Sequence, residues 1–241
     1  MVLTYLHKTR PGVFALLDPD RLSLREAGPL VESLCEDGIS AILIGTSFMT
    51  TSGFDRFVHA VKKSCSKPVI IFPGGTSQVS PHADAIFFLS LLSGRNPEYL
   101  IGEQARAAFM IREYRLEPIP VGYLLIDPGS YTSVEFVSQT RPIPRTKPEI
   151  ACAHALAGQY LGMKMIYLEA GSGGRKSVPP KMVSLVRKTI SIPLIVGGGI
   201  KSEKAARQMI DAGADYVVIG SVIERDRKTA RKIIRRIRRK Q

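Results

Sequence analysis

Residues 165–174 read Met-Ile-Tyr-Leu-Glu-Ala-Gly-Ser-Gly-Gly, an apolar segment of strand length that runs directly into a glycine-rich turn. The same order returns at residues 194–199, Leu-Ile-Val-Gly-Gly-Gly, and at residues 216–221, Tyr-Val-Val-Ile-Gly-Ser. Glycine leaves backbone N–H groups unshielded and permits positive φ, as a loop around an anion requires. One such turn is ordinary, but three in succession predict one phosphate held at the corner of a β/α barrel.

Apolar segments of strand length alternate with helical patterns along the whole chain. The predicted strands are residues 13–17, 39–44, 69–72, 85–89, 120–126, 165–168, 194–196 and 216–219. The predicted helices are residues 23–37, 55–63, 97–114, 149–161, 181–189, 202–212 and 225–240. This alternation in 241 residues favours a single α/β domain over residues 1–241, a (β/α)8 barrel of the TIM type. No G-x-G-x-x-G motif follows the first strand, which argues against a dinucleotide-binding sheet.

Two connections depart from a regular barrel. Residues 73–84 separate the third and fourth strands, include Pro81, and scarcely leave room for a helix, so we expect the third helix to be missing or replaced by an extended segment. Residues 127–148 are long and proline-rich, and carry Arg141, Arg145 and Lys147. Two interpretations stay open for them: a solvated surface loop, or a lid or anion-gripping loop over the barrel mouth.

The chain is strongly basic, with 34 Lys and Arg against 21 Asp and Glu and a formal net charge of +13, which favours anionic partners. Much of the excess lies in residues 225–240, where Ile233, Ile234 and Ile237 recur at helical spacing. This pattern indicates a last barrel helix with its isoleucines in the core, and it also suits peripheral contact with anionic membrane lipid. No nucleic-acid motif accompanies the charge, so no nucleic-acid partner is expected.

Cysteine and histidine usage argues against a metal or disulfide framework. Cys35, Cys65 and Cys152 are odd in number and far apart, so we expect reduced, mostly buried thiols, and the histidines form no paired zinc motif. No apolar run reaches membrane-spanning length, and residues 1–10 are too polar for a secretory signal. The expected location is therefore cytoplasmic.

Polar residues at the carboxyl ends of the predicted strands suggest a site, because these ends share the face on which barrel enzymes work. Asp18 and Ser47, on neighbouring strands, offer oxygen ligands for Mg²⁺, although Asp18 also suits a helix cap or an arginine partner. Glu169 can hydrogen-bond or deprotonate a substrate hydroxyl, or form a salt bridge within the barrel. No nucleophilic triad and no strand-end lysine for a Schiff base are present.

Taken together in order, these motifs resemble the geranylgeranylglyceryl phosphate synthase family, prenyltransferases that make the first ether bond of archaeal-type lipids. The resemblance runs nearly end to end, and its Pro-Ile-Pro-Arg motif is similar to the larger second group of the family. It is carried by Leu-Asp-Pro-Asp at 17–20, Gly-Thr-Ser at 45–47, Leu-Ser-Gly-Arg-Asn-Pro-Glu-Tyr-Leu-Ile-Gly at 92–102, Arg-Pro-Ile-Pro-Arg at 141–145, Ala-Leu-Ala-Gly at 155–158, and the segments 167–173, 196–200 and 220–221.

The resemblance implies a barrel that lacks its third helix, Mg²⁺ held through Asp18 and Ser47, and a geranylgeranyl or related prenyl group transferred from its pyrophosphate to the C3 hydroxyl of sn-glycerol 1-phosphate. Glu169 would orient that hydroxyl and take its proton, and pyrophosphate would be released. The implied glycerol phosphate site is Tyr167, Leu168, Glu169, Ala170, Gly171, Ser172, Gly173, Gly198, Gly199, Gly220 and Ser221. We assign pyrophosphate binding, from their loop alone, to Arg141, Arg145 and Lys147. Relatives of this group also lead us to expect a homo-oligomer, a dimer or a hexamer.

The chain departs from several relatives at two motifs. Gly45-Thr46-Ser47 stands in place of Gly-Gly-Ser, which adds a hydroxyl, and Gly220-Ser221 stands in place of Gly-Asn. The prenyl tail needs an apolar groove, for which the candidate walls are Ile86, Phe88, Leu91, Leu92, Tyr99 and Leu100, all equally suited to a core. Two other functions stay open: a phosphosugar or indole-glycerol-phosphate-like isomerase on the same phosphate corner, or a basic scaffold that binds lipid surfaces or nucleic acid through residues 225–240.

Overall fold

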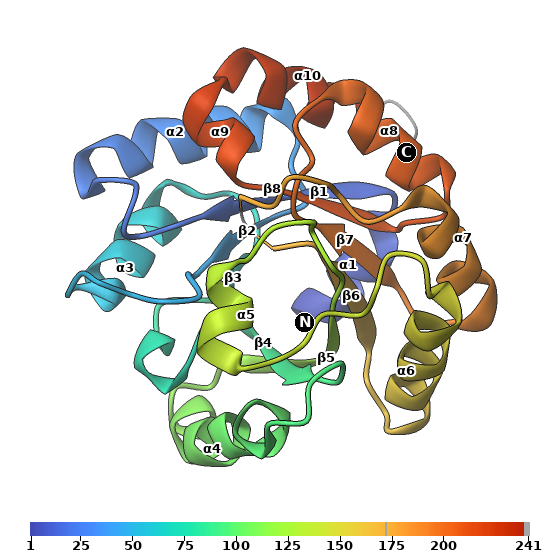
Figure 1. The fold of residues 1–241 in the computed structure, drawn as a ribbon. Helices are drawn as coiled ribbons and strands as arrows, with labels where there is room; N and C mark the ends of the chain where they lie inside the picture. Colours follow the sequence, from blue (N-terminus) through green and yellow to red (C-terminus); the bar gives the residue numbers. More distant parts are fainter. Residues whose placement is uncertain (172, 239–241) are drawn as a thin grey trace.

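The computed structural model describes residues 1–171 and 173–238 as a closed barrel of parallel strands in chain order, β1 to β8 (Figure 1). Gly12 pairs with Tyr216, so that β8 closes onto β1. The strands are β1 Gly12–Leu17, β2 Ala41–Ile44, β3 Val69–Ile71, β4 Ala85–Leu91, β5 Glu117–Leu125, β6 Met165–Glu169, β7 Leu194–Gly197 and β8 Tyr216–Ile219. The predicted α/β barrel is confirmed, with strand ends shifted by a few residues.

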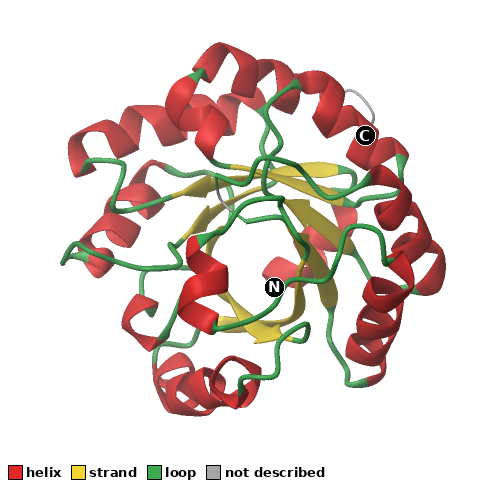
Figure 2. Cartoon of the chain, viewed as in Figure 1, coloured by secondary structure: helices red, strands yellow, loops and turns green. Residues whose placement is uncertain are grey.

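Helices surround the strands (Figure 2). They are α2 Leu24–Asp37, α3 Phe54–Ser64, α4 Glu103–Glu113, α6 Pro148–Tyr160, α7 Pro180–Thr189, α8 Glu203–Asp211, α9 Ser221–Arg225 and α10 Arg227–Arg238. α2 shows how the sequence sets such boundaries: Ser23 and Glu26 form a capping box at its start, and Gly38 ends it with a left-handed φ of 99°.

The core has two layers, because successive strand residues point to opposite sides. Tyr167, in β6, joins Phe14 and Phe87 inside the barrel, where all three side chains are fully buried. The next residue, Leu168, packs outside the barrel against the helices. Consequently, side chains at alternate positions near the strand ends face the barrel interior.

A short helix not expected from the sequence, α1 Val2–Lys8, closes the amino-terminal end of the barrel (Figure 1). Leu6 is fully buried in the inner layer, and its carbonyl accepts a hydrogen bond from the Tyr216 hydroxyl. Glu117, at the start of β5, accepts hydrogen bonds from the Val2 and Leu3 N–H groups. The carboxyl-terminal end of the barrel is therefore the end that opens.

The third barrel helix is absent, as predicted. In residues 72–84, all described, the structure has only a short 3-10 turn, η1 Thr76–Gln78. Buried Gln78 fixes this connection, because its side chain bonds both the N–H and the carbonyl of Thr46. The predicted helix over 97–114 begins instead with a π-helical turn, η2 Glu98–Gly102, before α4. No helix therefore lies between β3 and β4 in the chain, and β4 packs against η2 and α4, the elements that follow it.

The irregular segment 127–148 contains a short helix, α5 Ser133–Ser138, which lies across the carboxyl-terminal end of the barrel (Figure 1). Its second half is held outside the barrel, because Ile143 is buried and forms a parallel bridge with Ile126. Of the two interpretations, the structure favours a segment that covers the mouth.

The basic last helix packs as a barrel helix. Ile233, Ile234 and Ile237 are buried, as predicted. Arg231 and Arg235 both form ion pairs with buried Asp37 of α2, at 3.0 and 2.9 Å. Arg239 and Lys240, which the sequence placed in the same helix, lie outside the described residues. No helix within residues 1–171 and 173–238 is long and apolar enough to cross a membrane.

Candidate active site

A pocket of about 400 Å³ opens at the carboxyl ends of the strands. Its polar side is lined by Asp18, Thr46, Ser47, Tyr167, Glu169, Gly173, Gly198, Gly199, Gly220 and Ser221. Its apolar side is lined by β4, α4 and the segment that replaces the third helix, and α5 contributes to its rim. The predicted site residues after β1, β2, β6, β7 and β8 are therefore brought together.

The glycine turns after β6 and β7 form one side of the pocket. Gly171, Gly198 and Gly199 have φ values of 79°, 75° and 70°, which few other residues adopt. Ser202 caps α8 by accepting a hydrogen bond from the Ala205 N–H. Leu168 and Ala170 point into the outer core, so they can offer a ligand only their backbone. Ser172 lies outside the described residues.

Glu169 is buried between these turns, with 5% of its surface exposed. Burial raises its pKa to about 7, although the Tyr167 hydroxyl and the Gly171 and Ala170 N–H groups lower it. The Gly171 N–H donates to its carboxylate at 2.6 Å. The carboxylate forms no ion pair in the described part of the chain, so the structure does not show the alternative of a barrel salt bridge.

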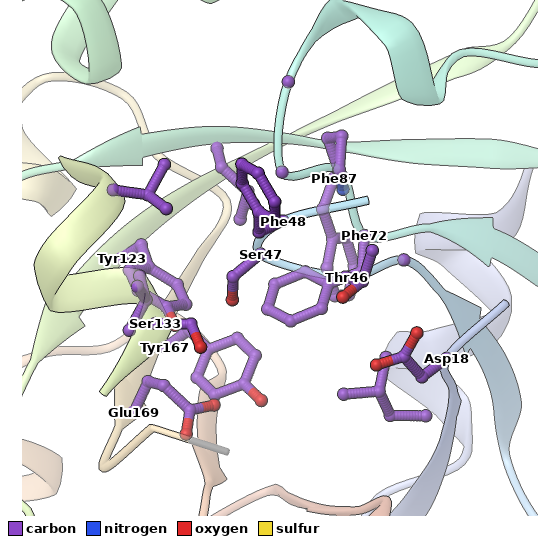
Figure 3. Close-up of a pocket in the computed structure, with 18 of the residues that line it drawn as sticks. Asp18, Thr46, Ser47, Phe48, Phe72, Phe87, Tyr123, Ser133, Tyr167 and Glu169 are labelled. Carbon is purple, nitrogen blue, oxygen red and sulfur yellow. The ribbon is translucent and has the colours of Figure 1, made fainter. Parts of the chain in front are cut away.

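Tyr167 stands beside Glu169 in the pocket (Figure 3). Its ring stacks on Phe72, with centroids 5.3 Å apart, and burial raises the pKa of its hydroxyl well above the usual value. The hydroxyl is close enough to lower the pKa of Glu169. Within the described residues it nevertheless has no partner of good hydrogen-bond geometry. A buried hydroxyl in this state is suited to bond a ligand.

Asp18 forms the opposite corner with two hydroxyl residues. Half-burial raises its pKa, and the Thr46 hydroxyl and the Asp20 N–H, which donates at 3.0 Å, lower it. Arg21 approaches its other oxygen at 3.5 Å, so the arginine-partner alternative for Asp18 is also present. Figure 3 shows Thr46 on the side of Asp18, whereas Ser47 points into the pocket. Thr46, which adds a hydroxyl to this motif, is thus a further candidate ligand beside the predicted Ser47.

The second carboxylate of the 17–20 motif is already engaged. Asp20 accepts hydrogen bonds from the N–H and hydroxyl groups of Thr50 and Thr51, at distances between 2.5 and 3.0 Å. These bonds hold the loop after β2 against the loop after β1. Asp20 therefore organises the corner and leaves Asp18 as its available carboxylate.

The predicted pyrophosphate residues need a correction. Arg141, Arg145 and Lys147 do not line the described pocket, because the Ile143 bridge carries their segment outside it. Arg145 donates to the Asp127 carbonyl at 3.1 Å, and Lys147 lies 3.9 Å from Glu149. The basic side chain that does line the pocket is Arg21, which also pairs with Glu224. Arg21 directly follows the Leu-Asp-Pro-Asp motif at residues 17–20, and this position could have predicted that it lies at the pocket.

The apolar side exists because the third helix is absent. Ile86 and Phe88, which belong to the outer layer of β4, line the pocket together with Ala107 and Ile111 of α4 and with Val79. Of the predicted groove walls, Ile86, Phe88, Leu91 and Tyr99 line the pocket, and Leu92 and Leu100 do not. One continuous cavity therefore joins an anion corner, a buried carboxylate and an apolar arm.

Comparison with known proteins decides the family. The model of the PcrB family matches residues 6–239. The chain belongs to this family. Geranylgeranylglyceryl phosphate synthase of Thermococcus gammatolerans is 51% identical, over 88% of this chain and 84% of the relative. The enzyme of the same name from Thermococcus kodakarensis is 49% identical, over 93% and 90% of the two chains.

Solved structures agree with this family membership. The (S)-3-O-geranylgeranylglyceryl phosphate synthase of Thermoplasma acidophilum, solved in complex with sn-glycerol-1-phosphate, superimposes with a TM-score of 0.92 at 36% identity, over 99% of this chain and 98% of the other. A thiamine phosphate pyrophosphorylase from Pyrococcus furiosus, at 14% identity and a TM-score of 0.62, shares the fold alone. The resemblance noted in the sequence is confirmed: the PcrB-family chain is an enzyme, a prenyltransferase of lipid biosynthesis.

Proposed function

We propose that this PcrB-family enzyme joins the C3 hydroxyl of sn-glycerol 1-phosphate to a geranylgeranyl group, releasing pyrophosphate with the help of Mg²⁺. The observation that carries the proposal is the single pocket that connects glycine turns, Glu169, the Asp18 corner and an apolar arm. The relatives are named for this product, and the Thermoplasma acidophilum structure contains sn-glycerol-1-phosphate.

The acceptor would occupy the glycine turns after β6, β7 and β8. Gly198, Gly199, Gly220 and Ser221 supply backbone N–H groups and a hydroxyl for the phosphate. Glu169 would accept a hydrogen bond from the C3 hydroxyl and take its proton as the ether bond forms. A pKa of about 7 suits that work, since the carboxylate is then both available and basic enough near neutral pH.

The Asp18 corner fits Mg²⁺ by its chemistry. The half-buried carboxylate of Asp18 and the hydroxyls of Thr46 and Ser47 are hard oxygen donors beside open pocket space. In residues 1–171 and 173–238 no group of three or more His, Cys, Asp or Glu side chains could hold a metal. Mg²⁺ does not require such a group, because it typically uses one or two carboxylates and fills its shell with water and phosphate oxygens. When bound, Mg²⁺ would neutralise charge on the departing pyrophosphate.

Arg21 would assist at the same corner. Its guanidinium is held between Asp18 and Glu224, at 3.5 and 3.3 Å, which keeps a cation beside the proposed pyrophosphate position. The apolar arm along Ile86, Phe88 and Ala107 would hold the prenyl chain and fix its reactive end between the two polar corners. The fold would thereby hold the hydroxyl close to that carbon, which lowers the barrier to transfer.

The isomerase alternative explains less of the pocket. A phosphosugar would use the glycine corner, but not an apolar arm that reaches Ala107 and Ile111. The basic-scaffold alternative is weakened as well, because Arg231 and Arg235 are committed to Asp37, and Arg236 pairs with Glu203 at 3.4 Å. Neither alternative accounts for the family match over residues 6–239.

A transfer assay tests the proposal. Purified protein is given labelled sn-glycerol 1-phosphate, geranylgeranyl pyrophosphate and Mg²⁺, beside sn-glycerol 3-phosphate and a metal-free control. We expect a butanol-extractable product with the 1-phosphate and metal only. Absence of product with every prenyl pyrophosphate tried, or equal product with both enantiomers and no metal, would contradict the proposal.

A further inference from the structure

Two half-buried cysteines lie in contact outside the pocket. Cys35 is in the last turn of α2, and Cys65 directly follows the end of α3. Their Sγ atoms are 3.3 Å apart, although the two residues are 30 positions apart in the sequence. Neither cysteine lines the pocket, and the proposed transfer reaction uses neither. The contact between them therefore needs an explanation of its own.

Packing between α2 and α3 sets this contact. The two helices follow the neighbouring strands β1 and β2 and lie side by side on the outside of the barrel (Figure 1). They approach each other closely, since a Cβ atom on Gly28 of α2 would lie 3.1 Å from the Ser64 hydroxyl at the end of α3. Both cysteines also pack against the buried outer layer of the core. The two sulfurs are therefore held together by packed elements of the fold.

The two sulfurs are close enough for a disulfide bond to form without movement of the helices. Such a bond joins sulfur atoms at about 2.05 Å, so from 3.3 Å each sulfur has to move by about 0.6 Å. Displacements of this size are ordinary thermal motion. The third cysteine, Cys152, lies in α6 and forms no such contact within the described residues. Among the three cysteines, only Cys35 and Cys65 are therefore placed to bond to each other.

The two thiols differ in reactivity. The hydrogen bond from Cys65 lowers the pKa of Cys35 to about 6 against the effect of partial burial, and hydrogen bonds from Ser66 lower it further. The same pairing, together with burial, raises the pKa of Cys65. Cys35 is thus the nucleophile at neutral pH, because the thiolate is the reactive form. Reaction of Cys35 removes the negative charge that helps keep Cys65 protonated, so Cys65 can then release its proton.

We propose that Cys35 and Cys65 are a modification site that reacts with a low-molecular-weight disulfide and closes to a cross-link between α2 and α3. The Cys35 thiolate attacks one sulfur of the small disulfide, which leaves a mixed disulfide on Cys35 and releases one small thiolate. Cys65 then loses its proton to solvent and attacks Cys35 Sγ, which releases the second small thiolate. The protein dithiol is oxidised by two electrons, and the small disulfide is reduced to two thiols. Excess small thiol reverses both steps.

The cross-link would stabilise the fold without touching the pocket. It encloses β2, the loop that carries Thr46 and Ser47, and α3. Closing this segment of chain restricts the unfolded state, which raises the temperature of unfolding. Because neither cysteine lines the pocket, the cross-link adds no contact to the proposed substrates. The proposal is therefore independent of the transfer reaction, and failure of either leaves the other standing.

Peptide mass spectrometry tests the reaction directly. The purified full-length protein is incubated with oxidised glutathione at neutral pH, blocked with iodoacetamide and digested without reduction. We expect a peptide pair joined through Cys35 and Cys65. Cys152→Ser, the matched control, should give the same pair, whereas Cys65→Ser should stop at glutathione on Cys35. A parent protein that keeps glutathione on Cys35 without the cross-link, or that keeps both thiols free for iodoacetamide, would overturn the proposal.

Thermal unfolding supplies the second readout. The oxidised parent and oxidised Cys152→Ser should unfold about 5 to 15 °C above their reduced forms, and dithiothreitol should abolish the difference. Cys65→Ser should show no such difference, and Cys35→Ser repeats the test by removing the other thiol. Unfolding of the oxidised parent at the same or a lower temperature would refute a stabilising cross-link. An equal rise in Cys65→Ser and Cys35→Ser would assign the effect to attached glutathione and would also refute it.

Discussion

Gly198 faces the carboxylate of Glu169 so closely that any side chain at this position would displace it. A Cβ atom on Gly198 would collide with Glu169 Oε1 and lie 2.8 Å from the Gly171 nitrogen, the same N–H that donates to Glu169. The φ of Gly198 is 75°, in the left-handed region. The turn after β7 therefore fixes the proposed base on β6.

Gly198→Ala should consequently damage catalysis more than stability. Adopting the left-handed φ costs an alanine about 1 kcal/mol, and the collision must move Glu169 or Gly171, so kcat/KM should fall about a hundredfold or more. Gly162→Ala is the matched control, since Gly162 has a φ of 89° but nothing within 4 Å of its added Cβ. Steady-state kinetics and thermal unfolding of both variants check this. Equal activity losses in the two would contradict the role of Gly198.

Ionisation of Glu169 should make kcat/KM rise with pH on the acid side of the pH profile. As a base it works only when ionised, and its pKa is about 7, so kcat/KM should fall as pH drops below about 7. Glu169→Gln should lower kcat by about a hundredfold to ten-thousandfold and flatten that limb. A Glu169→Gln enzyme with the parental pH profile would assign the titration to another group, such as the substrate phosphate.

Ionisation of Glu169 should lower the free energy of unfolding at high pH. The folded pKa of about 7 lies above the reference value of 4.5, so the fold favours the protonated form. That contribution is fully present below about pH 4.5 and is lost as pH rises through about 7, with a total on the order of 3 kcal/mol. Glu169→Gln should therefore unfold at higher denaturant concentration than the parent at about pH 8, with the gap closing in acid. A gap that does not change with pH would contradict this origin.

Features set by residues close together in the sequence could be predicted. Features set by contacts between distant residues could not. The alternating strands, the missing third helix and the glycine turns follow from local patterns, and all are confirmed. The positions of Arg141, Arg145 and Lys147 could not be predicted from local patterns, because the Ile126–Ile143 bridge that holds them outside the pocket is a tertiary contact. Helix α1 was not predicted for the same reason, because Leu6 becomes buried only by packing against the amino-terminal end of the folded barrel.

Metal titration of variants should show which of the two hydroxyls at the Asp18 corner, Thr46 or Ser47, contributes to Mg²⁺ binding. If Asp18 holds Mg²⁺ together with Thr46 or Ser47, Asp18→Asn should raise the Mg²⁺ concentration needed for half-maximal rate by about tenfold to a hundredfold. Thr46→Val and Ser47→Ala, measured by the same titration, should show which hydroxyl contributes, because only the ligand's variant shifts that concentration. Full activity of Asp18→Asn after chelation would exclude a metal at this corner.

Cys35 and Cys152 should be alkylated at different rates. The Sγ atoms of Cys35 and Cys65 are 3.3 Å apart, and the hydrogen bond from Cys65 lowers the pKa of Cys35 to about 6, while the same pairing raises the pKa of Cys65. Cys35 should therefore be alkylated at neutral pH faster than Cys152, which is also half-buried. Cys65→Ala should move the midpoint of the Cys35 alkylation profile upward, as followed by mass spectrometry. A midpoint that stays in place would show that Cys65 does not set it.

The apolar arm should determine which length of prenyl chain the enzyme accepts. Ala107 on α4 is buried and lines the arm beside Ile111, so Ala107→Phe would fill space that a long chain needs. The kcat/KM for geranylgeranyl pyrophosphate should fall at least about tenfold, while farnesyl or geranyl pyrophosphate should be used as well as before or better. Ala108→Phe is the matched control, because Ala108 is the next residue of the helix and faces solvent. If both variants keep the same order of preference for donors as the parent, the prenyl chain does not run along α4, and the arm between Ile86 and Ala107 serves another purpose.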